Sequence, residues 1–65
     1  MNNIKKFRLE QGYKLGHFAE LCDLSSGYIC HLEKGSRINP SCKTMQKIAN
    51  ALNKTVAEVF FNEDR

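Results

Sequence analysis

The stretch that decides the fold runs from residue 25 to residue 35 and reads SSGYICHLEKG. It begins with Ser25, a residue that caps helix N-termini well, and ends with Gly35, the residue favoured just beyond a helix C-terminus. We therefore expect a helix over about residues 25–34.

This helix has two unlike sides when its residues are placed at about 3.6 per turn. One side is apolar and can dock onto a core; it holds Tyr28, Ile29 and Leu32. The other side is small and polar, and it holds Ser26, Gly27, Cys30, His31 and Lys34. It lacks the Glu/Lys pairs of an ordinary solvated face, so another surface has room to approach it closely.

Length and composition bound the class of protein. The chain has 65 residues, enough for one small domain, and its 42% hydrophobic and 26% charged residues are typical of a soluble globular fold. No apolar run is long enough to span a membrane, and no apolar segment follows the first charges as in a secretory signal. We therefore expect a cytoplasmic protein with no membrane partner.

Three cysteines, Cys22, Cys30 and Cys42, form an odd set without C-x-x-C spacing. A disulfide framework favours an even count, and a zinc site needs paired ligands at short spacing. We expect reduced thiols, two of them in the core, with no metal site and no cofactor.

Charge is distributed unevenly along the chain. The net charge is +3, but residues 1–57 carry nine basic and four acidic side chains, or +5. Three acidic residues fall in the last eight positions. This asymmetry suits a body that faces a polyanion and a tail that does not.

Four further short helices are predicted, over about residues 2–12, about 14–22, from a cap at Asn39 or Ser41 to Asn53, and about 55–61. The fourth carries an apolar stripe at i, i+3, i+4 and i+7, and the fifth opens with a Thr55–Glu58 capping box. No stretch alternates as a strand would. The sequence therefore predicts a single all-α domain over residues 1–65.

The order of these features resembles the helix-turn-helix domains of the phage repressor/Cro (xenobiotic-response-element) family. The matching residues run from Ile4 to Phe60 and include FAE at 18–20, LS at 24–25, YI at 28–29, LEKG at 32–35 and NPS at 39–41. The resemblance implies a lambda-repressor-like bundle in which the second and third helices form the motif. It also implies that the third helix lies in the DNA major groove.

The resemblance assigns base-contacting positions on the third helix. These are Ser26, Gly27 and His31, with Cys30 beside them. A solvent-exposed histidine is the alternative for His31. No Arg, Gln or Asn faces the groove from this helix, so we expect DNA shape, water or residues elsewhere to add specificity.

Phosphate contacts are expected around this helix and at the start of its neighbours. The candidates are Lys14, Tyr28, Lys34, Ser36, Arg37, Ser41 and Lys43. Lys14 and Leu15 stand where the family has Ser or Thr followed by a phosphate-binding Gln, so Lys14 would have to replace that contact as a point charge. We expect Lys47 and Lys54 to be merely solvated.

Arg8 and Glu33 allow two interpretations. They are either a phosphate contact and a reader of cytosine, or, as the resemblance implies, a structural ion pair between the first and third helices. We favour the ion pair, because removing either partner would strand a partly buried charge.

The fifth helix is expected to have two roles. Its apolar residues Val56, Val59, Phe60 and Phe61 are more than a small bundle needs for its core. The resemblance places this helix at a homodimer interface. We therefore expect a dimeric repressor that binds double-stranded DNA at a palindromic operator, with half-sites about 34 Å apart.

Two other classes of function are alternatives to a DNA-binding regulator. A helical protein-interaction module that has lost DNA binding is favoured by Leu15 and by the plain base-contacting face. Charge reversal of Arg37 and Lys43 would spare the function of such a module but abolish that of a DNA binder. An enzyme is rejected, because no nucleophile–base set surrounds either histidine and the chain is too small for a sizeable pocket or small-molecule site.

Overall fold

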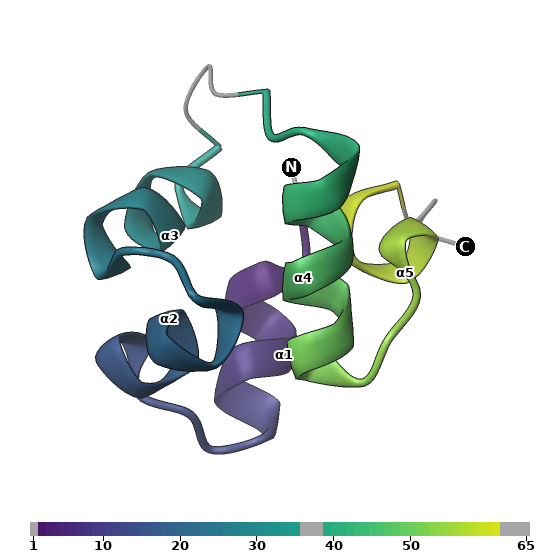
Figure 1. Ribbon diagram of the computed structural model, residues 1–65. Coiled ribbons are helices and arrows are strands. Elements are labelled where there is room, and N and C mark those ends of the chain that lie inside the picture. Colours follow the sequence, from purple (N-terminus) through teal and green to yellow (C-terminus); the bar gives the residue numbers. More distant parts are fainter. Residues whose placement is uncertain (1, 36–38, 62–65) are drawn as a thin grey trace.

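The computed structural model describes residues 2–35 and 39–61, and within these ranges it is all-helical. The helices are α1 (Ile4–Glu10), α2 (Leu15–Cys22), α3 (Ser26–Glu33), α4 (Cys42–Leu52) and α5 (Val56–Phe60). Figure 1 shows α4 in the centre, with α2 and α3 on one side of it and α5 on the other. The prediction of five short helices without strands is confirmed for the described residues.

Side-chain caps begin three of the helices, as local sequence predicts. The Ser25 hydroxyl accepts a hydrogen bond from Tyr28 N at 3.1 Å, and the Ser41 hydroxyl accepts one from Thr44 N at 3.1 Å. The Ser41 cap decides between the two predicted starts of α4. Thr55 caps α5, and this helix has the predicted capping box.

Two helices, α2 and α4, end at a residue whose backbone adopts the left-handed conformation. Asp23 and Asn53 have φ of 60° and 59° after α2 and α4. Both residue types enter this region more readily than most because their short side chains bond locally. The turn between α2 and α3 therefore forms without a glycine.

The first helix is shorter than predicted. It begins at Ile4 rather than residue 2, because Asn2 and Asn3 use their side chains to bind other elements. It ends at Glu10, and Gly12 follows with a φ of 79° that breaks the helical path.

The core lies between α4 and the four other helices. Its fully buried large side chains come from every helix and are Ile4, Phe18, Cys22, Ile29, Ile48, Leu52 and Val59. Leu24 in the turn packs against this cluster. None of the helices described is both long and apolar enough to cross a membrane.

The cysteine prediction is partly wrong. Only Cys22 is a core residue, whereas Cys30 is half-buried and Cys42 is exposed. All three are free thiols. Burial raises the pKa of the Cys22 thiol to about 11.

Candidate nucleic-acid interface

The outer face of α3 is the candidate contact surface. The structure places Ser26, Gly27 and His31 together on this face as exposed residues, and Cys30 beside them is half-buried. The helix carries no long side chain here other than the histidine. This surface can come close to a partner and offers hydroxyl, imidazole and thiol groups to it.

The inner face of α3 is anchored in the core. Ile29 has no exposed surface, Leu32 is 3% exposed, and Tyr28 is half-buried against the same cluster. Anchors along the helix fix its rotation about its own axis. The outer residues are therefore presented in one orientation.

Arg8 on α1 and Glu33 on α3 form a buried ion pair. Arg8 Nε donates to Glu33 Oε2 at 2.6 Å and Arg8 Nη2 donates to Glu33 Oε1 at 3.2 Å, with both side chains only 8% exposed. Arg8 Nη1 also donates to the Tyr13 carbonyl at 2.9 Å. Because both groups are enclosed and paired, neither is free to meet a phosphate or a base.

The side chain of Asn2 also holds the C-terminal end of α3, an interaction that the sequence did not predict. Asn2 Nδ2 donates to the Leu32 carbonyl at 2.7 Å, while Asn2 Oδ1 accepts from Ile4 N at 3.1 Å. The only sequence signal was an asparagine near a helix start, which is too common to identify such a partner. The ion pair and this amide together fix the end of α3 that follows His31.

The charged phosphate candidates that the structure describes are exposed at the ends of three helices. Lys14 precedes α2, Lys34 ends α3 and Lys43 lies in the first turn of α4. Tyr28 is half-buried and Ser41 is exposed. Ser36 and Arg37 lie outside the described residues.

Ser41 has less freedom than its exposure suggests. Its hydroxyl accepts from Thr44 N and donates to Thr44 Oγ1, each at 3.1 Å. The single hydroxyl hydrogen of Ser41 is therefore already donated within the protein. A phosphate at this point would be bound more readily by the first backbone N–H groups of α4 than by the serine side chain.

The start of α2 differs from the capped helices. Lys14 occupies the N-cap position without a side-chain cap, and Leu15 packs against the core instead of reaching outward. His17 is exposed, with its ring edge-on to Tyr13 at a centroid distance of 5.7 Å. Lys14 is thus the side chain at this end that can supply a positive charge.

The predicted dimer residues divide into core and surface. Val59 has no exposed surface, so its role is in the chain's own core, and the interface prediction for this residue is wrong as a direct contact. Phe61 is 59% exposed, whereas Val56 and Phe60 are half-buried. The apolar surface of this helix is therefore smaller than predicted.

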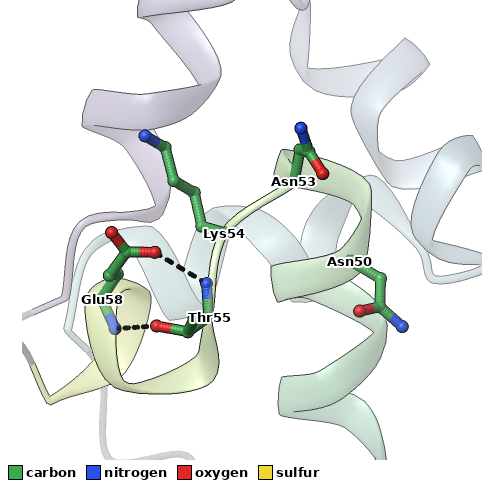
Figure 2. Close-up of a pocket in the computed structure, with 5 residues that line it drawn as sticks. All are labelled: Asn50, Asn53, Lys54, Thr55 and Glu58. Carbon is green, nitrogen blue, oxygen red and sulfur yellow. Dashed lines mark hydrogen bonds between the residues drawn. The ribbon is translucent and has the colours of Figure 1, made fainter.

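The hollow at the α4–α5 junction contains the capping box of α5. Figure 2 shows it lined by Asn50, Asn53, Lys54, Thr55 and Glu58. Thr55 N donates to Glu58 Oε1 at 2.9 Å and Glu58 N donates to Thr55 Oγ1 at 3.0 Å. The bond from the Thr55 backbone lowers the pKa of Glu58. These bonds cap α5, and they give the hollow a structural role.

The expectation that Lys54 is merely solvated is wrong, because this residue is half-buried beside the hollow. Its Nζ lies over the Phe7 ring at 4.7 Å from the centroid, a cation–π contact between the α4–α5 connection and α1. Lys47 lies 3.8 Å from the highly exposed Asp23 carboxylate, too loose a pair to contribute much. Within residues 2–35 and 39–61, no three His, Cys, Asp or Glu side chains gather as metal ligands would.

Comparison with known families and proteins gives one consistent result. A family described as helix-turn-helix matches residues 4–59. The HTH-type transcriptional regulator SinR of Bacillus licheniformis is 30% identical over 61 residues, which cover 94% of this chain and 55% of SinR. The chain spans about half the length of the curated relatives it matches.

Solved structures agree with the family match. The N-terminal DNA binding domain of SinR from Bacillus subtilis has a TM-score of 0.83 at 29% identity, covering 95% of this chain and 88% of that domain. The clp gene regulator ClgR from Corynebacterium glutamicum has a TM-score of 0.77 at 33% identity, covering 85% of this chain and 57% of ClgR.

Proposed function

The chain belongs to the helix-turn-helix family, and on this basis we propose that it is a DNA-binding transcription regulator of the Cro/C1 type. The observation that carries the proposal is the outer face of α3, exposed and small, on a helix whose inner face is locked into the core. A B-DNA major groove admits a helix of this kind. In the proposed complex α3 lies in that groove and α2 crosses the phosphate backbone.

Base contacts in this complex come from the outer face of α3. Ser26 and His31 supply hydrogen-bonding groups, and Gly27 and Cys30 lie between them as small neighbours. Without a bidentate side chain, each base is distinguished by fewer direct bonds than an Arg–guanine or Gln–adenine pair would give. Groove shape and ordered water then carry part of the sequence preference.

Phosphate contacts flank the groove. Lys14, Lys34 and Lys43 are exposed at three helix ends and supply the positive charge. The remaining candidates are Tyr28, Ser36, Arg37 and Ser41. Such contacts position the protein on the duplex without reading its sequence.

The regulator binds as a homodimer in this proposal. Phe61 is a large apolar side chain with 59% of its surface exposed, and half-buried Phe60 lies next to it with ring centroids 6.5 Å apart. Pairing of α5 across a two-fold axis would cover them and require a palindromic operator with half-sites about 34 Å apart. Occupying that operator in the cytoplasm would repress transcription without any enzymatic step.

Selection of bound duplexes from a random DNA pool at two salt concentrations tests the proposal. An enriched two-fold symmetric motif, bound less tightly as salt rises, is the expected result. A single asymmetric half-site would refute the dimer but keep DNA binding. If folded protein retains no DNA even at low salt, the proposal fails, and the protein-interaction module suggested by the inward-facing Leu15 takes its place.

The proposed phosphate contact of Lys43 can be tested with a second lysine, Lys54, as the matched control. Lys43 lies in the first turn of α4, whereas Lys54 follows the other end of α4 and lies over the Phe7 ring. Neutralising either to Gln removes one charge. Lys43→Gln should lower affinity similarly on all DNA sequences and reduce the slope of log K against log salt by about 1, whereas Lys54→Gln should leave the slope unchanged. Equal slopes in the two variants would remove Lys43 from the interface.

A further inference from the structure

The glycines of the described chain fall into two groups. Gly12 and Gly35 have φ of 79° and 75° just beyond helix ends, a backbone conformation that favours glycine. Gly16 and Gly27 have no such φ, and a Cβ at either position would meet no atom within 4 Å. Neither backbone geometry nor packing therefore requires glycine at position 27.

The same helical position carries a side chain in the helices outside the motif. The second residue is Lys5 in α1, Lys43 in α4 and Ala57 in α5, whereas both helices of the motif have glycine there, Gly16 in α2 and Gly27 in α3. Glycine at this point of α3 lowers helix stability relative to alanine, because its backbone loses more freedom on folding. Glycine at position 27 thus lowers the stability of the fold, and no contact within the fold compensates for this loss.

The protein cannot easily make room for added bulk at position 27 by moving α3. Ile29 is fully buried, and Glu33 at the other end is bonded to Arg8 at 2.6 Å. A larger side chain at position 27 would instead point outward, into the space that the duplex would occupy.

We propose that Gly27 determines DNA specificity by having no side chain, an inference that rests on the proposed DNA-binding function. Its absence lets the first turn of α3 lie close to the base edges. His31 lies four residues on, and residues at this spacing are neighbours on one helix face. Close approach at Gly27 brings the His31 imidazole within reach of a base, a contact that a more distant helix would lose.

Binding of the duplex selected from the random pool tests this inference at constant salt. Gly27→Ala adds one methyl group and removes the helix cost of glycine, so it should fold at least as well as the wild type yet bind more weakly. Gly27→Leu should weaken binding by about tenfold or more, the order expected for one lost base contact. Lys5→Leu places a leucine at the same position of α1, where the side chain is exposed and outside the proposed DNA and dimer contacts, and should keep affinity within about twofold of wild type.

A double-mutant cycle shows whether Gly27 acts through His31. His31→Ala should cost about tenfold in the wild type and less than about twofold in Gly27→Leu, because the contact is already lost there. Wild-type protein that binds the duplex while Gly27→Leu stays within twofold would overturn this inference alone. Additive losses would overturn the role of His31 in it. Wild-type protein that binds no duplex would overturn the proposed function as well.

Discussion

The Arg8–Glu33 pair should act on folding and not on DNA recognition, and Glu33→Ala tests this directly. The substitution removes two hydrogen bonds, at 2.6 and 3.2 Å, and leaves the Arg8 guanidinium with only the Tyr13 carbonyl as a bonded partner. Both side chains are about 92% buried, so solvent cannot replace the lost carboxylate easily. Breaking a pair of this kind costs about 3–5 kcal/mol.

This loss is large for a 65-residue domain, whose whole unfolding free energy is of the order of 3–10 kcal/mol. Urea titration followed by circular dichroism should show a free energy of unfolding about 3–5 kcal/mol lower in Glu33→Ala than in the wild type. The double variant Arg8→Met with Glu33→Leu removes both charges, and it should recover much of the loss because no unpaired charge remains. Glu33→Ala within about 1 kcal/mol of wild type, or a stable Glu33→Ala that has lost DNA affinity, would refute the structural role.

Three further predictions concern the rest of the chain. The lowered pKa of Glu58 means that its carboxylate stabilises the fold above the unfolded-state pKa of about 4.3. This contribution to stability is lost as pH falls through the lower folded-state pKa. Glu58→Gln should therefore flatten the acid side of the Tm–pH profile, and a profile identical to that of the wild type would contradict the role of this carboxylate. Iodoacetamide at pH 8 should alkylate exposed Cys42 well before Cys22, whose pKa is about 11, and equal rates would contradict the burial of Cys22. Phe61→Ser should weaken self-association in analytical ultracentrifugation while Leu9→Ser, at a comparably exposed leucine, should not; equal effects would place the dimer contact elsewhere.

Local features of this fold could be predicted because their causes are local. Ser25 and Thr55 cap helices through hydrogen bonds to residues three positions away, so the sequence alone contains both partners. The outer face of α3 follows from helical periodicity once Ile29 and Leu32 are assigned to the core. These short-range rules are sufficient for the helix order and for the exposure of the proposed base-contacting face.

Long-range bonds could not be predicted in the same way. Asn2 reaches Leu32, and Gln11 Nε2 donates to the Leu52 carbonyl at 2.7 Å, 41 positions along the chain. An asparagine or glutamine can bond almost any carbonyl, so its residue type carries no information about the partner. Pairing of Arg8 with Glu33 was expected only through the family resemblance.

The hydrophobic pattern of α5 also did not predict which of its apolar residues lie in the core and which lie at the surface. Helical spacing predicts that Val56, Val59 and Phe60 all point inward. In a helix as short as α5, however, only the place where the neighbouring helices meet it is fully buried. Val59 occupies that place, and its carbonyl accepts from Asn3 N at 2.8 Å. Phe61 lies beyond the last turn and stays exposed.

The docking of the outer face of α3 onto DNA is the central claim, and NMR titration of the isotope-labelled protein with the selected duplex tests it most directly. The largest amide shifts and line broadening should fall on Ser26, Gly27 and His31, with smaller changes near Lys14 and Lys43. The α4–α5 junction around Lys54 should stay unperturbed. Shifts that centre on that junction, or no shifts in α3 at saturating duplex, would contradict the claim.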